Sequence, residues 1–340
     1  MAAPRAGLRP TRLPRGARSP GAALRTAAAL ALAAALGGCA LPISSGPPQV
    51  RDGRLLQRPA GLPDQARVSG VPFYPDDTNA CGPASLAEVL RFAGVDTDVE
   101  RLKPQLITPA LDGTLQYDML GATRRAGRVA YVIRPSLGEL FENVAQGRPV
   151  VVLQRLGIPG NIWHFAVVVG YDLRHDSVTL RSSTARALVL SVGQFDATWA
   201  GGGRWAFVAL RPGEFPAQVQ PLRYLQAVAP MEGVAPVAAR RAYRDALARW
   251  PDSWVAMMGL GNLAYARKDY AQAAARFAQA ASAHPDDGDP LNNLAQALLA
   301  AGDLQGARSA VERAVAVGKP NPQVYAKTRE QILSAASSAH

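Results

Sequence analysis

The stretch TNACGPASLAEVLRFAG, residues 78–94, contains Cys81, one of only two cysteines in a chain of 340 residues. Gly82 and Pro83 follow the cysteine, and proline suits the first turn of a helix. Apolar residues then recur at helical spacing over residues 84–92, namely Leu86, Val89, Leu90 and Phe92. The sequence therefore predicts a helix immediately behind Cys81. A thiol there faces unsatisfied backbone N–H groups and the positive end of the helix dipole, which favour the thiolate.

The other cysteine, Cys39, ends a segment typical of an export signal. Residues 1–26 contain six arginines and no acidic residue, and residues 26–36 are almost entirely alanine and leucine. This apolar run is too short for a membrane-spanning helix of roughly 20 residues. The following Leu-Gly-Gly-Cys, residues 36–39, resembles the lipobox of bacterial lipoproteins. The alternative is an ordinary secretory signal in which the cysteine falls by chance.

That resemblance implies a signal peptide over residues 1–38 and a lipid on Cys39. Ala40 follows the cysteine where an aspartate usually signals retention in the inner membrane, so the expected location is the outer membrane, facing the periplasm. If Cys39 is acylated, Cys81 has no intramolecular partner in an oxidising compartment. Cys81 is then either buried and inert or kept because it reacts, and it is not part of a structural disulfide.

Charge and motifs limit the classes of partner. The formal net charge of +11 includes the six signal arginines, which leaves +5 for the mature chain (11 − 6). Such a mild excess requires no nucleic-acid partner. The chain shows no clustered basic face, zinc-ligand spacing or phosphate loop, so neither a metal nor an organic cofactor is expected.

The mature chain divides by composition. Residues 39–65 start at the lipidated cysteine and are rich in Pro, Gly and Ser, which predicts a flexible tether. Residues 66–211 place helical patterns first, at 84–92, 115–126 and 136–147, with Ser136 as candidate N-cap. Short β-rich runs follow, at residues 149–154, 164–172, 177–182, 187–192 and 204–210. This order predicts an α+β domain with a mostly antiparallel sheet, and residues 212–235 are expected to be a linker.

Residues 236–335 contain a repeat of 34 residues. Three sets of equivalent positions share this spacing: Ala239, Ala273 and Ala307; Tyr243, Phe277 and Val311; Ala246, Ala280 and Ala314. The pattern resembles the tetratricopeptide repeat, with two complete units and the second helix of a third, and predicts an all-α domain. Such arrays usually bind a protein segment in their groove. The alternative is that they only pack on the first domain or dimerise.

A cysteine nucleophile needs a base, and the chain has four histidines. His175 falls in a predicted turn, His284 at a repeat boundary, and His340 is the last residue. Only His164 enters an apolar strand, at its leading edge, where a side chain can face a cleft. The alternative is a core histidine without a catalytic role.

Two segments, ACGPASLAEVLRFAG at residues 80–94 and WHFAVVVGYD at residues 163–172, resemble the cysteine and histidine boxes of the bacteriocin-leader (double-glycine) peptidases, a papain-like branch of cysteine peptidases. The stretch GTLQYDMLGATRRAG between them and the repeats behind them are similar to stand-alone lipoproteins of this type. The resemblance implies a papain-like fold in which Cys81 is the nucleophile and His164 its general base. The backbone N–H of Cys81 would donate to the oxyanion.

Two positions depart from the family pattern. These enzymes usually carry a glutamine shortly before the cysteine as oxyanion donor, whereas this chain has Asp76 and Asp77 there, and Asn79 is the nearest amide. The acid that orients the histidine is normally on the following strand. Here Ser182 or Ser183 takes that place, with Asp172 and Asp196 as alternatives that the sequence does not position.

Three hypotheses about function follow. The first is a lipid-anchored cell-envelope cysteine peptidase that cleaves a peptide (amide) bond and whose repeats recruit a protein partner or substrate. The second is an inactive or weak pseudo-peptidase that serves as a periplasmic binding or scaffold lipoprotein, which the altered donor and acid positions favour. The third is acyl transfer on the same intermediate, such as transpeptidation.

Overall fold

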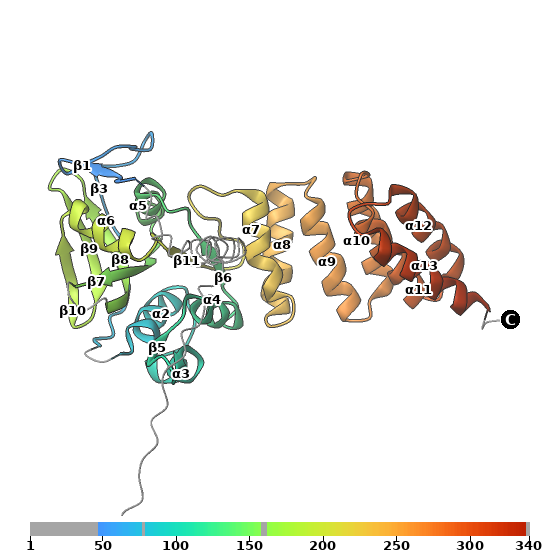
Figure 1. Cartoon of the computed structure of the whole chain (residues 1–340), viewed down its shortest axis with the longest axis horizontal. Helices are drawn as coiled ribbons and strands as arrows, with labels where there is room; N and C mark the ends of the chain where they lie inside the picture. Colours follow the sequence, from blue (N-terminus) through green and yellow to red (C-terminus); the bar gives the residue numbers. More distant parts are fainter. Residues whose placement is uncertain (1–46, 77–78, 158–161, 338–340) are drawn as a thin grey trace, which may run out of the picture. The chain divides into compact units, whose positions relative to one another are not determined.

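The computed structural model describes residues 47–76, 79–157 and 162–337 (Figure 1). The predicted signal peptide, Cys39 and the first part of the predicted tether lie outside the described residues. A mixed α/β domain comes first, and a run of helices follows it, as the sequence predicts. Within the described ranges, no helix combines the length and apolar character that crossing a membrane requires.

The sheet of the first domain is antiparallel at every pairing of the described strands. Its strand order is β10-β9-β8-β7-β11-β6, and β3 also pairs with β8. The bounds are β3 (Gln65–Arg67), β6 (Val129–Val132), β7 (Val150–Leu156), β8 (Ile162–Asp172), β9 (Ser177–Ser182), β10 (Ala185–Leu190) and β11 (Ala206–Leu210). The predicted run at residues 177–182 coincides with β9, whereas β3 and β6 are strands that the sequence reading missed.

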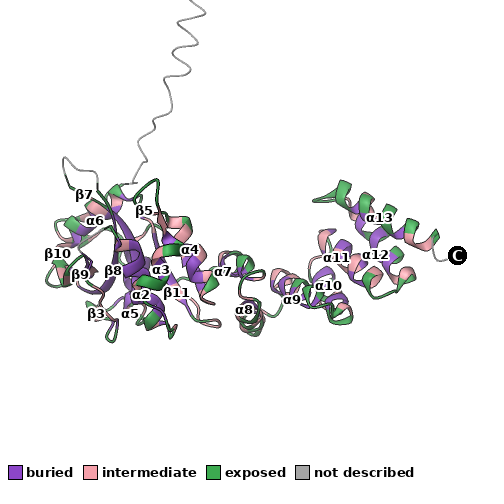
Figure 2. Cartoon of the chain, turned by 90° about the horizontal axis from the view of Figure 1, so that it is seen from below, coloured by how far each residue is buried: buried purple, intermediate pink, exposed green. Residues whose placement is uncertain are grey.

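Two central strands carry the core. Most inner residues of β7 and β8 are valine or alanine, and Val151, Val152, Ala166 and Val167 are fully buried. Strands with such continuous apolar runs need cover on both faces. Helices α2 (Cys81–Phe92) and α5 (Leu137–Ala145) pack on β8, and α6 (Val192–Gly201) packs on β7. Figure 2 shows the buried residues concentrated along α2 and β8.

Helix α2 begins at Cys81 itself, slightly before the predicted start. The first helical hydrogen bond runs from the Ala84 N–H to the Ala80 carbonyl, at 2.9 Å. Pro83 lies within the first turn, where a backbone N–H has no partner in the helix, so its missing donor costs nothing. Two more helices follow, α3 (Val99–Leu106) and α4 (Gln116–Arg125), with the short hairpin of β4 (Ile107–Thr108) and β5 (Gly113–Thr114) between them.

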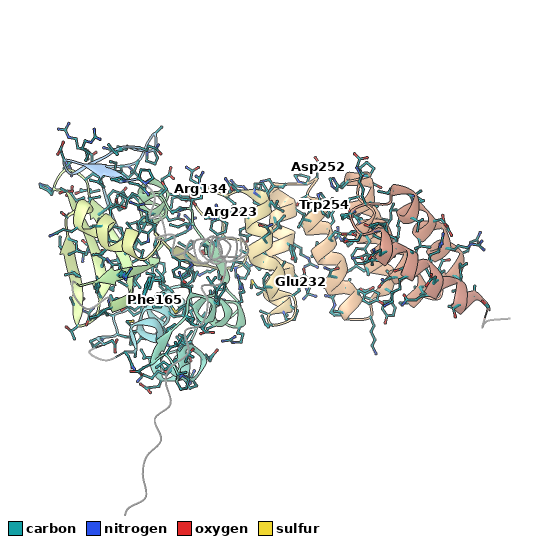
Figure 3. All side chains as sticks on the ribbon, in the orientation of Figure 1. Arg134, Phe165, Arg223, Glu232, Asp252 and Trp254 are labelled. Carbon is teal, nitrogen blue, oxygen red and sulfur yellow. The ribbon has the colours of Figure 1, made fainter. Side chains whose placement is uncertain are left out.

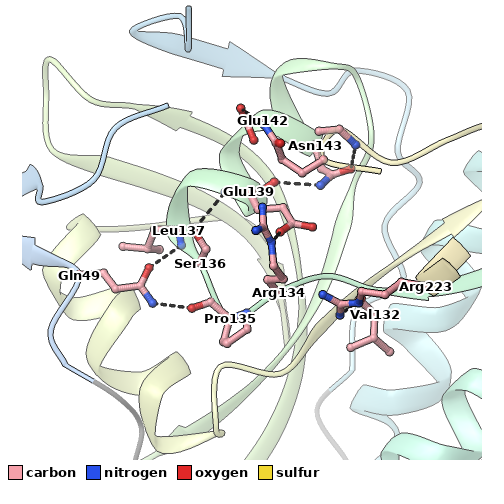
Figure 4. A network of polar contacts seen from close by, with 12 residues as sticks. Gln49, Val132, Arg134, Pro135, Ser136, Leu137, Glu139, Glu142, Asn143 and Arg223 are labelled. Carbon is pink, nitrogen blue, oxygen red and sulfur yellow. Dashed lines mark hydrogen bonds and ion pairs between the residues drawn. The ribbon is translucent and has the colours of Figure 1, made fainter. Parts of the chain in front are cut away.

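The end of the predicted tether is folded onto the domain. It forms the hairpin of β1 (Val50–Arg51) and β2 (Arg54–Leu55). Gln49 holds the start of α5: its side-chain amide donates to the Pro135 carbonyl at 2.6 Å, and its Oε1 accepts from the Leu137 N–H at 2.7 Å (Figure 4). Ser136 caps α5 as predicted, because its side chain accepts from the Glu139 N–H. From Gln49 the chain is therefore bound to the first domain rather than extended away from it.

The predicted linker at residues 212–235 is also folded. It contains α7 (Pro221–Val228) and the 3₁₀ turn η1 (Ala229–Met231). Tyr224, Leu225 and Val228 of α7 are buried, and Arg223 donates to the Val132 carbonyl of β6 at 3.1 Å (Figure 4). This segment joins the core of the first domain to the helices that follow.

The C-terminal helices are α8 (Pro236–Arg249), α9 (Trp254–Ala266), α10 (Tyr270–Ala283), α11 (Asp289–Ala300), α12 (Leu304–Val317) and α13 (Pro322–Ser337). All nine positions of the 34-residue repeat are buried, on the second helices α8, α10 and α12. Gly259 and Gly261 let α9 approach its neighbours, because a Cβ at these positions would overlap the rings of Tyr243 and Phe277. The repeat thus arises from small residues at each helix contact.

Candidate active site

Cys81 and His164 line one cleft of about 700 Å³ in the first domain. Cys81 lies at the N-terminus of α2, and His164 lies near the start of β8. The cysteine is half-buried and not in a disulfide. Phe165, labelled in Figure 3, lines the same cleft, and its backbone lowers the pKa of the Cys81 thiol, so β8 contributes both the histidine and a group next to the sulfur.

The chain before Cys81 is fixed to the turn after β9 by two hydrogen bonds. The Asp76 N–H donates to the Ser183 carbonyl at 3.1 Å, and the Ser183 hydroxyl donates to the Asp76 carbonyl at 2.9 Å. Behind the cysteine, Gly82 packs against Thr114 so closely that a Cβ would overlap the threonine side chain. Position 82 therefore needs a glycine for a steric reason, because Thr114 of β5 lies against the start of α2 there.

Ser182 is bonded to His164. The Nε2 of His164 lies 2.9 Å from the Oγ of Ser182, and both side chains are buried. The other two candidates for orienting the histidine are engaged elsewhere. Asp196 forms a buried bidentate ion pair with Arg204, with distances of 2.8 and 3.0 Å. Asp172 accepts hydrogen bonds from Arg174 and His175 at the far end of β8.

Burial changes the titration of both reacting groups. Desolvation raises the pKa of the Cys81 thiol, and the charge of Asp76 adds to the rise, whereas backbone hydrogen bonds lower it by less. The pKa of His164 is lowered by burial, and Asp76 opposes that shift. The sequence-based expectation of a resting thiolate is thus wrong in direction, because the burial of the sulfur outweighs the backbone N–H groups around it. Both shifts favour a neutral thiol and a neutral imidazole over an ion pair.

The candidate oxyanion donor Asn79 also lines the cleft, but its amide is engaged. Its Nδ2 donates to Oδ1 of Asp112, in the turn between β4 and β5. Asp76 is buried, and its charge acts on both Cys81 and His164. A carboxylate thus lies near the reacting pair, close to the place where the family usually has a glutamine.

Sequence reasoning missed a second buried carboxyl near Cys81. Glu88 of α2 is 2% exposed, and desolvation raises its pKa to about 8. Its Oε1 accepts from the Tyr74 N–H at 3.2 Å, while its Oε2 is buried and has no hydrogen-bond partner among the described residues. Glu88, Arg181 and Cys81 line a small cavity on the α2 side of the thiol. The sequence did contain a signal for this buried carboxyl, because Glu88 falls among the apolar residues of the predicted helix.

The described residues include no hydrogen bond between the Cys81 thiol and the His164 ring and no group of His, Cys, Asp and Glu side chains able to hold a metal ion. The Nε2 of His164 is used by Ser182, so Nδ1 is the nitrogen left for Cys81. Reacting groups are often farther apart in a free enzyme and approach one another when substrate binds.

Three family models match the chain. Residues 65–201 match the Peptidase_C39 like family. Residues 238–285 and 264–330 match two models of the tetratricopeptide repeat. The match of the first model ends before β11, which lies between β7 and β6 in the sheet.

Solved structures show the same likeness at low identity. A C39-like peptidase from Bacillus anthracis is 18% identical, with a TM-score of 0.37, over 44% of this chain and 98% of that one. The peptidase domain of Streptococcus ComA, a bifunctional ABC transporter, is 21% identical, with a TM-score of 0.34, over 42% and 99%. A double-glycine-motif protease from an AMS/PCAT transporter is 20% identical, with a TM-score of 0.32, over 42% and 94%. No curated protein matches the chain.

Proposed function

We propose that this chain, a C39-like peptidase domain followed by tetratricopeptide repeats, is a cysteine peptidase that cleaves a peptide bond through an acyl-enzyme. The observation that supports it best is the cleft that two residues share. Cys81, the one free cysteine among the described residues, lines this cleft together with His164, and the Nε2 of His164 is hydrogen-bonded to Ser182.

His164 acts as the general base through Nδ1. For that nitrogen to accept a proton, Nε2 must carry the ring hydrogen, and the Ser182 oxygen at 2.9 Å accepts it. The Cys81 thiol gives its proton to Nδ1 as the sulfur attacks the carbonyl carbon of the substrate. Since the resting pair is neutral, this proton transfer accompanies the attack instead of preceding it.

The tetrahedral intermediate carries a negative oxygen, to which the backbone N–H of Cys81 donates. The protonated His164 then gives its proton to the leaving amine, and the C–N bond breaks. Water attacks the remaining thioester with His164 again as base, which releases the acid and restores the Cys81 thiol. Ser182 supplies no charge to stabilise the imidazolium, so the negative charge of Asp76, which favours protonation of His164, takes on that role.

The remaining parts extend this proposal. The lipobox-like sequence at residues 36–39 supports a lipid on Cys39 and a place in the cell envelope, at the periplasmic face of the outer membrane. The repeats have two complete helix pairs, α9 with α10 and α11 with α12, and the single helices α8 and α13 beside them. They support recruitment of a protein partner or substrate to the enzyme.

One observation favours the alternative of an inactive binding module. Asp76 raises the pKa of Cys81, and its carboxylate stands near the position of the family's amide donor, where it would repel an oxyanion. A domain with that pair of features could bind peptides without cleaving them.

Turnover of a quenched fluorescent peptide library by the purified full chain tests the proposal. Cleavage is expected in the wild type and is expected to fall below detection in Cys81→Ala and His164→Ala. His175→Ala, at an exposed histidine bonded only to Asp172, is the matched control and should retain full activity. Mass spectra of the products separate hydrolysis from acyl transfer to an added amine. A library left intact by wild type, with peptides still bound, would favour the binding module.

A further inference from the structure

The cleft at Cys81 has two apolar walls that the fold leaves exposed. On one wall, Leu111 lies in the turn between β4 and β5 and Leu115 follows β5, and the two residues are 60% and 44% exposed. Ile162 and Trp163 start β8 on the other wall, with 60% and 51% exposed. All four line the cleft that contains Cys81.

Below these walls, the floor of the cleft is also apolar. Leu153 and Phe165 face each other across β7 and β8 and are 6% and 4% exposed. Of thirteen large hydrophobic side chains exposed in the described part of the chain, four are gathered here. An exposed apolar patch beside a cleft is typical of a ligand-binding surface, because a ligand that covers the patch removes apolar side chains from water.

Each wall is joined to a neighbouring segment by a polar or cation–π contact. Trp163 packs under the guanidinium of Arg155, whose Cζ lies 5.5 Å from the ring centroid, and the two residues are paired across β7 and β8. The opposite wall is anchored by the Asn79–Asp112 hydrogen bond, which joins the β4–β5 turn to the segment before Cys81. Contacts that hold a site in its bound arrangement lower the cost of ordering it when a ligand binds.

We infer that the substrate is an extended peptide with large apolar side chains, of the leucine or phenylalanine class, on the residues that flank the scissile bond. This inference rests on the proposed function, because it takes the cleft at Cys81 as the substrate site. A peptide with two glycines before the bond has no side chains there, so the four exposed residues would stay in contact with water and contribute nothing to binding.

A peptide is favoured over a purely apolar ligand such as a fatty acyl amide. The same cleft contains polar side chains, Asn79, Asp112 and Gln116, beside the apolar walls. A peptide backbone needs hydrogen-bond partners along its length, and polar side chains at the cleft can supply them. An acyl chain offers no donor or acceptor to these groups and would remove them from water at a cost. The alternation of apolar side chains and backbone amides in a peptide fits both kinds of surface.

Binding to the full chain carrying Cys81→Ser tests the inference without chemistry. The probes are two dye-labelled twelve-residue peptides of equal charge, one with leucine and one with glycine at the two positions on each side of a central bond. Fluorescence anisotropy is expected to show the leucine peptide binding at least about tenfold tighter, the usual scale for filling an apolar pocket. Leu111→Ser and Trp163→Ala should each weaken that binding by about tenfold and leave the glycine peptide unaffected.

Leu222→Ser is the matched control, because Leu222 is 55% exposed on α7 and lies outside the cleft. It should change neither affinity. Equal binding of both peptides, tighter binding of the glycine peptide, or a lauroyl amide that competes better than the leucine peptide would overturn the inference. Wild-type cleavage of the two peptides is followed separately. Leucine-selective binding without cleavage would contradict the peptidase proposal alone, and cleavage without leucine preference would contradict only the substrate class.

Discussion

His164 and Ser182 lie 18 residues apart in the chain, yet the Nε2 of the histidine is 2.9 Å from the hydroxyl oxygen of the serine. The antiparallel pairing of β8 and β9 brings them together. The serine fixes which ring nitrogen can act as the base without adding a charge to the site. The activity should therefore depend on Ser182 for orientation and respond to a charge placed there.

Ser182→Ala is expected to lower kcat about tenfold to a hundredfold, since a hydrogen bond to a group that becomes charged contributes about 1.5–3 kcal/mol. Ser182→Asp should instead raise the pKa of His164, because a carboxylate favours the imidazolium. The histidine pKa is measured by NMR titration and kcat by peptide cleavage. Ser177→Ala, at the other end of β9, is the control. An unchanged kcat in Ser182→Ala would contradict the orienting role.

Alkylation of Cys81 by iodoacetamide should rise with pH, with a midpoint above the usual thiol value of about 8.5. The reason is that burial and Asp76 raise the pKa of the thiol, so the reactive thiolate forms late. Asp76→Asn removes one of these causes and should shift the midpoint to lower pH. The rate is followed by mass spectrometry on the peptide containing Cys81, with urea-unfolded chain as reference. A rate plateau below pH 7 would contradict the neutral resting pair.

Glu88 should make the fold less stable as the pH rises. Its pKa of about 8 in the folded chain exceeds the ordinary value near 4.3, so the unfolded chain ionises first. Stability attributable to the neutral carboxyl is complete below about pH 4 and decreases until about pH 8. Relative to Glu88→Gln, the wild type should lose a few kcal/mol between pH 5 and pH 8 in urea unfolding. Glu330→Gln, on an exposed face of α13, should show no such trend.

Replacing only one partner of the Asp196–Arg204 ion pair should strongly lower the free energy of unfolding. Both side chains are buried, at 8% and 4% exposed, and two hydrogen bonds join them. Arg204→Leu leaves Asp196 charged and buried, with only the Gln49 N–H at 3.2 Å, and is expected to destabilise the first domain by about 3–5 kcal/mol. Breaking the exposed pair Arg91–Asp96 should cost less than about 1 kcal/mol. Similar losses in the two variants would contradict this difference.

Gly261→Ala should destabilise the repeats although alanine is the better helix former. Its Cβ would overlap the Phe277 ring, and overpacking of this kind costs about 1–3 kcal/mol. Gly193→Ala in α6 is the control, because the nearest atom to a Cβ there lies 4.0 Å away. Thermal unfolding followed by circular dichroism compares the two. A higher Tm in Gly261→Ala would show that α9 can move away from α10.

The elements that sequence reading found are those with a single strong pattern. Strand β9 alternates buried and half-buried residues, and the 34-residue repeat keeps small residues at fixed places, so both are visible without a structure. Helix α3 was missed because Pro104 lies inside it and reads as a helix breaker. Helix α7 was missed because its apolar side chains become part of the core only by packing on β6, which the sequence reading did not find.

That Cys81 and His164 line one cleft could be predicted for a related reason, since each is the one residue of its type in a segment with clear periodicity. Their roles as nucleophile and base stay a prediction. The protonation of the pair was not predictable. The sequence shows that Cys81 precedes a helix. It does not show that the sulfur is buried in the fold, near Phe165 and Asp76. Desolvation depends on contacts between segments far apart in the chain, and a local pattern contains no information about them.

The hydrogen bonds from Gln49 to the start of α5 limit the distance between the first domain and a membrane anchor at Cys39. If Cys39 carries a lipid, only ten residue steps (49 − 39) separate the bilayer surface from the first residue bound to the peptidase domain. Even fully extended, ten residues span no more than about 35 Å. The domain would then stay within a short distance of the bilayer surface. Its substrates would have to be membrane-bound themselves or be brought close to that surface by the repeats.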